Sequence, residues 1–198
     1  MFKNSPAVKA SVAMLLALLL GGCTKGLGRS LPYDAWKLNF FGPAYMEAWI
    51  ETADVVDINE RVFRGAGSGI VSTGYPTAFS KGIPTKFLGK PKGWPPHPGG
   101  SGRHVRGADL PRLVYVRWQS LAEPQTYEAY IEIPESARTT MLKGERAFCG
   151  ADGKWITDYR KLLIVGLAPG GIAKVYLGGP CLKSTEVTRV QGTINPEG

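Results

Sequence analysis

Two neighbouring stretches decide the fold: "RLVYVRWQS" (Arg112–Ser120) and "YEAYIEI" (Tyr127–Ile133). In both, apolar residues recur at every second position, which is the period at which a β-strand turns its side chains to one face of a sheet. In the first stretch one face has Leu113, Tyr115 and Arg117, and the other has Val114, Val116 and Trp118. In the second stretch one face has Tyr127, Ala129, Ile131 and Ile133, and the other has Glu128, Tyr130 and Glu132. We therefore expect two antiparallel strands, and the polar side of the second indicates that it is half-buried.

Further strand patterns lie on both sides of this pair. A short helix is expected from Pro134 to about Lys143, because proline is tolerated in the first turn and Gly144 follows the end. The expected strands are Trp36–Phe41, Tyr45–Glu51, Arg160–Leu167, Ile172–Leu177 and an edge strand, Thr185–Gln191. Together they predict one mainly β domain over residues 31–192, an antiparallel sandwich or strongly bent sheet, with a flexible tail at residues 193–198.

The stretch Thr73–Pro111 interrupts these strands. It contains 8 Gly and 7 Pro, a composition that cannot maintain a regular helix or strand ladder for long. We interpret it as a long Gly/Pro-rich loop with room for one short strand. Loops of this length in a small domain are usually functional or disordered.

The N-terminus has the pattern of a secretory signal peptide. Lys3 and Lys9 give a basic start, and no charge occurs from Ala10 to Gly22. The apolar run is too short to span a hydrocarbon core of about 30 Å as a permanent helix. We therefore expect residues 1–22 to be a signal peptide that is removed.

The signal ends in Leu20-Gly21-Gly22-Cys23, which resembles the bacterial lipobox. The resemblance implies that the Cys23 thiol is acylated, that cleavage occurs before it, and that residues 23–30 are a lipidated tether. Two or more acyl chains give a stable anchor. Because Thr24 rather than Asp follows, the sorting rule of enteric bacteria implies the outer membrane, with the body in the periplasm. An ordinary signal peptide or a buried apolar helix is the alternative.

Cys149 and Cys181 are the other two cysteines. The periplasm permits disulfides, so these residues are candidates for a disulfide. A bond between them would stabilise the fold by about 3–4 kcal/mol in the chain-entropy model. Two buried thiols packing as small apolar groups are the alternative.

Charge is unevenly distributed. The chain has net charge +8, and removal of the signal leaves +6. The stretch from Glu47 to Glu60 has five acids and no base, whereas the Gly/Pro-rich loop has six bases and one acid. Such asymmetry steers encounters with charged partners. The candidate residues for partner or lipid contact are Lys81, Lys86, Lys90, Lys92, Trp94, Arg103 and Arg106.

This asymmetry leaves several interpretations open. The two charged regions could face each other or be solvated surface, or the loop could contact anionic lipid or an acidic protein. Nucleic acid is not expected, because the location argues against it and the bases form no compact run with interleaved aromatics.

Motifs for catalysis, metals and cofactors are missing from the sequence. Ser68 lacks the glycine spacing of a nucleophile elbow, and the glycines around it lack the context of a dinucleotide loop. His97 and His104 have no nearby Cys or clustered carboxylates. We expect no enzyme activity, metal or cofactor, and keep a hydrolase built from Ser68, His97 or His104, and Asp109 as a minor alternative.

The chain resembles an uncharacterised group of Gram-negative lipoproteins, domain of unknown function 2931 (DUF2931). The resemblance lies in "LPRLVYVRWQSLAEPQTYEAYIEIPE" (Leu110–Glu135), "GLAPGGIAKVYLGGPC" (Gly166–Cys181) and, less specifically, Trp36 with "FFGPAYMEAWIE" (Phe40–Glu51). It implies a lipoprotein with no established catalytic residues.

These observations predict a non-catalytic periplasmic lipoprotein that binds a protein partner. Its most concrete form is an immunity protein against a secreted lipase-type toxin, by analogy with other small envelope lipoproteins. A structural or envelope-maintenance lipoprotein that contacts anionic lipid is the alternative.

Overall fold

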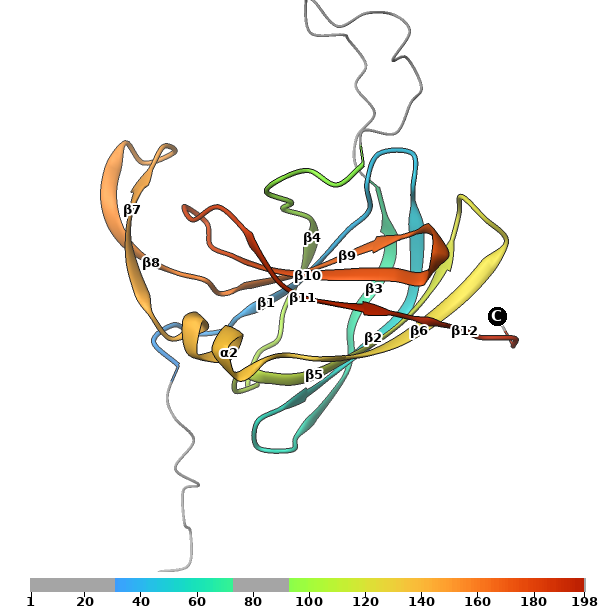
Figure 1. Ribbon diagram of the computed structural model, residues 1–198. Helices are drawn as coiled ribbons and strands as arrows, with labels where there is room; N and C mark the ends of the chain where they lie inside the picture. The colour runs from blue at the N-terminus through green and yellow to red at the C-terminus, as the bar shows by residue number, and fades with distance from the viewer. Residues whose placement is uncertain (1–30, 73–92, 198) are drawn as a thin grey trace, which may run out of the picture. The chain divides into compact units, whose positions relative to one another are not determined.

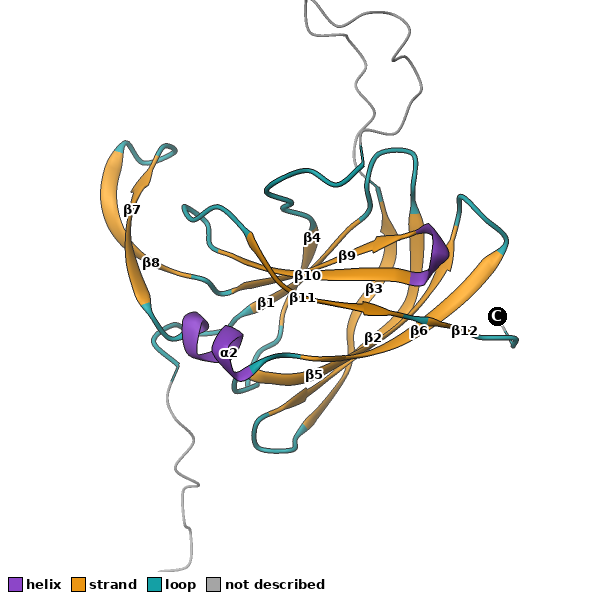
Figure 2. Cartoon of the chain, in the orientation of Figure 1, coloured by secondary structure: helices purple, strands orange, loops and turns teal. Residues whose placement is uncertain are grey.

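The computed structural model describes residues 31–72 and 93–197, and Leu31–Gly198 form one compact unit. The expected signal peptide and tether, with Cys23, lie outside the described residues, as does most of the Gly/Pro-rich loop. Strands dominate the described chain, and α2 (Glu135–Met141) is its one α-helix (Figure 2). None of the helices in this part of the chain is long and apolar enough to span a membrane.

Ten of the described strands form two five-stranded sheets, seen as separate layers in Figure 1. Sheet A has the order β11-β10-β9-β1-β4, and sheet B has the order β12-β6-β5-β2-β3. The strands of sheet A are β1 (Lys37–Phe41), β4 (Ser101–His104), β9 (Leu162–Ala168), β10 (Ile172–Gly178) and β11 (Thr185–Gln191). Those of sheet B are β2 (Ala48–Asp57), β3 (Val62–Val71), β5 (Pro111–Ser120), β6 (Gln125–Glu132) and β12 (Thr193–Ile194).

The core lies between the two sheets, as the alternating patterns predict. In β5, Val114, Val116 and Trp118 are fully buried, while Tyr115 and Arg117 face outward. The opposing layer contributes the inward residues of β1, β9 and β10, including Leu38, Leu163, Val165, Val175 and Leu177. The mainly β, sandwich-like architecture is therefore confirmed. The described strands and core residues all belong to the compact unit Leu31–Gly198.

Two features of the sheets depart from expectation. One pair, β1 with β9, is parallel, whereas the other ladders of the described chain are antiparallel. The chain also stays paired beyond residue 192, where a flexible tail was expected. Thr193 and Ile194 pair with β6, and the Asn195 N–H donates to the Thr126 carbonyl at 2.8 Å. The unpaired edge of β6 captures this segment, so the ordered domain extends further than its composition suggested.

One of the hairpins in the structure was not predicted from the sequence. Among the described strands, β7 (Gly144–Cys149) and β8 (Lys154–Tyr159) pair only with each other, and they form what we call the arm. In Figure 1 the arm and α2 lie at the end of the sandwich where β1 begins. It follows directly from α2 in the chain, so the short helix leads from sheet B into the arm.

Candidate interaction surfaces

The predicted contact residues fall into two groups. Lys81, Lys86, Lys90 and Lys92 lie outside the described residues. Arg103 and Arg106 are exposed at the edge of sheet A, in β4 and just after it. The described part of the loop therefore presents two of the six expected cations.

Trp94 is not the exposed aromatic that the sequence suggested. Its ring is half-buried on the outer face of sheet A, 6.4 Å from the ring of Phe41, with the Lys174 ammonium 4.7 Å from its centroid. Gly166 makes room for it, since a Cβ there would come within 2.5 Å of the indole. Trp94 covers the sheet, and its burial reduces its value as a contact for a partner.

The segment after Trp94 is attached to the same face. The His97 Nδ1 donates to the Ser184 carbonyl at 2.9 Å, and the Ser184 hydroxyl donates to the Pro98 carbonyl at 2.8 Å. Asn39 donates its amide to the Gly100 carbonyl at 3.3 Å. His97 is thus engaged in holding the loop to sheet A.

The structure does not bring the hydrolase candidates together. Ser68 lines a groove between β3 and β4 with Arg103, whose guanidinium lies 3.4 Å from its hydroxyl. His104 lines a different hollow, described below. Asp109 is buried and accepts from the Leu110 N–H and the Asn59 amide. Among residues 31–72 and 93–197, no three His, Cys, Asp or Glu side chains are grouped to hold a metal ion.

Cys149 and Cys181 form a disulfide, with Cα atoms 5.0 Å apart. It joins the end of β7 to the loop after β10. Asp158 of β8 adds a second tie, because its carboxylate accepts from the Cys181 N–H at 2.8 Å. One face of the arm is thereby held against the body of the domain.

The other face of the arm carries aromatic residues that sequence reasoning missed. Phe148 and Trp155 are directly opposite each other across the hairpin, with ring centroids 5.8 Å apart. They are 52% and 60% exposed. The Arg146 guanidinium lies 5.7 Å from the Trp155 centroid. The alternation in "ERAFCGADGKWIT" around a Gly-containing turn is the signal that could have indicated this hairpin.

The outer face of sheet B is a second aromatic surface. Trp49 and Tyr130 are 45% and 65% exposed. Exposed Ile70 is directly opposite Trp49, and the Tyr115 and Tyr130 rings lie 4.8 Å apart. The strand registers place Trp49 toward one end of the face and the Tyr115–Tyr130 pair toward the other. The Glu51–Arg117 ion pair (2.6 Å) lies between them.

Hydrogen bonds order the tyrosine end of this face. The Tyr115 hydroxyl donates to the Glu128 carboxylate at 3.0 Å. Burial, followed by this hydrogen bond and the Glu128 charge, raises the pKa of Tyr115 to about 12. The hydroxyl is therefore protonated at neutral pH and acts as a donor. The Asn195 amide donates to the same carboxylate at 3.2 Å, so the residue that follows β12 contributes to the surface.

Three of the five acids in the acidic stretch form ion pairs with arginines of sheet B or of its β2–β3 turn. Glu51 pairs with Arg117, Asp57 with Arg61, and Glu60 with Arg112. Across β2, β5 and β6, the outward positions provide four carboxylates and one guanidinium: Glu51, Asp54, Glu128, Glu132 and Arg117. This part of the face is net negative.

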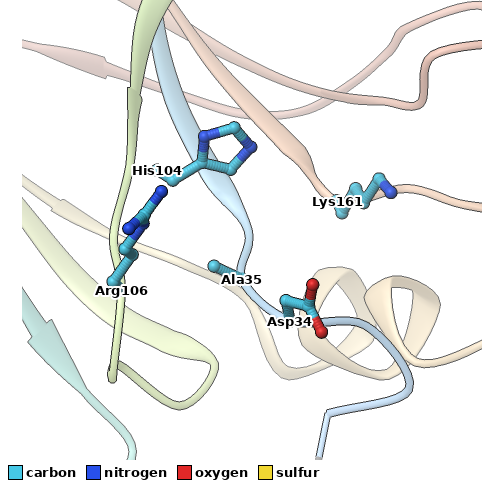
Figure 3. A pocket seen from close by; sticks show the side chains of 5 residues that line it. All are labelled: Asp34, Ala35, His104, Arg106 and Lys161. Carbon is cyan, nitrogen blue, oxygen red and sulfur yellow. The ribbon is translucent and has the colours of Figure 1, made fainter.

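A basic hollow of about 580 Å³ opens at the end of sheet A where β1 and β9 begin. Asp34, Ala35, His104, Arg106 and Lys161 line it. Figure 3 shows His104 and Arg106 on one side, with Lys161 and Asp34 on the other. Three chain segments meet there because β1 pairs with β4 on one side and with β9 on the other.

A family model described as "Protein of unknown function (DUF2931)" matches residues 23–195. The matched range includes every described strand, so it covers both sheets and the arm. No curated protein and no solved structure matches the chain.

Proposed function

Because the chain belongs to DUF2931, a family whose description states no activity, we propose from its surfaces that it is a non-catalytic lipoprotein that binds a protein partner. Acylated Cys23 anchors it in the inner leaflet of the outer membrane, with the domain in the periplasm. The partner docks on the outer face of sheet B.

The observation that carries this proposal is the exposure of Trp49 and Tyr130 on one rigid sheet face. Tryptophan and tyrosine dominate the binding energy of protein interfaces because they bury a large area with few rotatable bonds. Here they stand on paired strands, so little conformational entropy is lost when a partner covers them.

The charge of the face indicates the chemistry of the partner. Asp54, Glu128 and Glu132 leave the β2, β5 and β6 part of the surface negative, so a partner with a basic patch is favoured. In its most specific form the partner is a secreted lipase-type toxin, and binding blocks it.

We expect the native protein to carry acyl chains on Cys23. Mass spectrometry of the chain isolated from membranes should show a mature N-terminus at Cys23 with a lipid-sized mass increase, and Cys23→Ser should abolish both. An intact leader, or an unmodified thiol in the native protein, would refute the anchor.

We expect the partner to be crosslinked by a residue on the outer face of sheet B. A photo-crosslinking amino acid at Tyr130 should give one discrete protein adduct in cells, and the same amino acid at Phe148 on the arm should not. With the purified partner, Trp49→Ala should weaken binding by about 10-fold to 30-fold, the usual loss for a central interface aromatic.

Trp155→Ala is the matched control, since it removes an exposed tryptophan from the arm. Equal losses for Trp49→Ala and Trp155→Ala, or no discrete adduct at Tyr130, would contradict the assignment of this face.

A further inference from the structure

The end of the domain where the described chain begins combines three features. Tyr33 packs edge-on against Tyr159 at the base of the arm, with centroids 5.6 Å apart. Asp34 and Ala35 line the basic hollow. The first described residues therefore contact the arm at Tyr33 and line the hollow at Asp34 and Ala35.

The proposed anchor lies close to this end along the chain. Eight residues, Cys23 to Ser30, precede Leu31. At about 3.4 Å per extended residue they reach at most about 27 Å. An acylated Cys23 would thus keep this end of the domain within a short distance of the bilayer surface.

The hollow has the chemistry of a phosphate site. Arg106 and Lys161 supply two cations and His104 an imidazole N–H donor, against the single carboxylate of Asp34. In the part of the chain that the structure describes, neither the Arg106 nor the Lys161 side chain forms an ion pair. Both charges are available to an external anion.

The arm adds an apolar contact of the kind found at membrane interfaces. Cys149 and Asp158 hold one of its faces to the loop after β10, so the face with Phe148 and Trp155 turns away from that loop. Tryptophan rings favour the headgroup level of a bilayer, and Arg146 beside Trp155 can meet the lipid phosphates.

We propose that this end is a membrane-docking surface: Phe148 and Trp155 seat in the lipid interface while Arg106, Lys161 and His104 bind the phosphates of anionic phospholipid headgroups. That this end faces the membrane is inferred from the proposed anchor. Which residues contact the lipid is inferred from the hollow and the arm alone. Docking at this end leaves the outer face of sheet B accessible to the protein partner.

The test uses residues 23–198 with Cys23→Ser, which carry no acyl chain and contain the whole compact unit Leu31–Gly198. This protein should co-sediment at low salt with phosphatidylcholine vesicles that contain phosphatidylglycerol, and not with phosphatidylcholine alone. Arg106→Ala with Lys161→Ala should weaken binding by about 30-fold, since each cation near an anionic surface is worth about fivefold. Trp155→Ala should weaken it by about fivefold, and bound vesicles should shift the tryptophan emission to shorter wavelength.

Two controls remove a matched side chain from elsewhere. Trp49→Ala takes a tryptophan from sheet B, and Arg189→Gln takes an exposed arginine from β11, the opposite edge of sheet A from β4. Both should bind vesicles like the parent. Absence of vesicle binding at low salt, parental binding by the Arg106/Lys161 variant, or a larger loss in Trp49→Ala than in Trp155→Ala would overturn the proposal. An unmodified native Cys23 would refute the anchor without affecting these results.

Discussion

Replacing Asp57 by alanine should lower the free energy of unfolding by about 3–5 kcal/mol. The Asp57 carboxylate is fully buried at the end of β2 and accepts from the backbone N–H groups of Asn59, Arg61 and Asp109 at 2.9–3.0 Å. The Arg61 guanidinium pairs with it at 2.7 Å. Alanine would leave three backbone donors without an acceptor, and these donors hold together the β2–β3 turn and the segment that leads into β5.

The same carboxylate predicts a pH dependence. Burial alone would raise the pKa of Asp57, but hydrogen bonds from the Asp109 and Arg61 backbones, the Arg61 side chain and the Asn59 backbone outweigh it and hold the pKa below 3.8. A lowered folded pKa means that the stabilisation is complete above the unfolded value, near pH 4, and is lost as the pH falls below it. The stability advantage of the parent over Asp57→Asn should therefore be constant above about pH 5 and shrink as the pH falls below about 4.

Urea unfolding at several pH values measures both effects. Asp57→Asn keeps one acceptor and should cost less than alanine. Asp54→Ala is the matched control on the same strand: its carboxylate accepts one hydrogen bond, from Gly65, at the surface, so the loss should stay below about 1 kcal/mol. If Asp57→Ala cost no more than Asp54→Ala, the network would not hold the turn.

The sandwich could be predicted from the alternating stretches because in each of them every second side chain is buried on the same face of a strand. Val114, Val116 and Trp118 face the core as expected, and Thr185–Gln191 is the edge strand β11. Alternation identifies a strand but not its partner. The parallel pairing of β1 with β9, which joins residues more than a hundred positions apart, could therefore not be predicted from either strand.

The candidate surfaces were less accessible to prediction for related reasons. The basic hollow exists only because β1 pairs with both β4 and β9, which brings His104 and Lys161 to the same end of sheet A. The arm turns Phe148 and Trp155 outward, so its apolar positions do not mark a core. The prediction that Trp94 is exposed is wrong because nothing in the sequence of its loop indicates that the ring packs over Gly166.

Trp118→Ala should cost about 3–5 kcal/mol, the range for removing a large aromatic side chain from a close-packed core. Trp118 is fully buried and stacks on Tyr127 with ring centroids 5.5 Å apart. Its far edge fills the space over Gly192, where a Cβ would come within 2.7 Å of the indole. The indole thus bridges β5, β6 and the turn that leads from sheet A into β12, and alanine would leave a cavity that none of them can close.

Thermal unfolding followed by circular dichroism measures this loss, which corresponds to about 10–15 °C for a domain of this size. Trp155→Ala is again the matched control, since its ring is mostly in solvent and its removal opens no cavity, so the change should stay within about 1 kcal/mol. A small loss for Trp118→Ala would mean that β12 and the turn at Gly192 do not pack on the indole. A large loss for Trp155→Ala would mean that the arm is part of the folding core, and the exposed aromatic pair would then be needed for stability rather than available to a membrane.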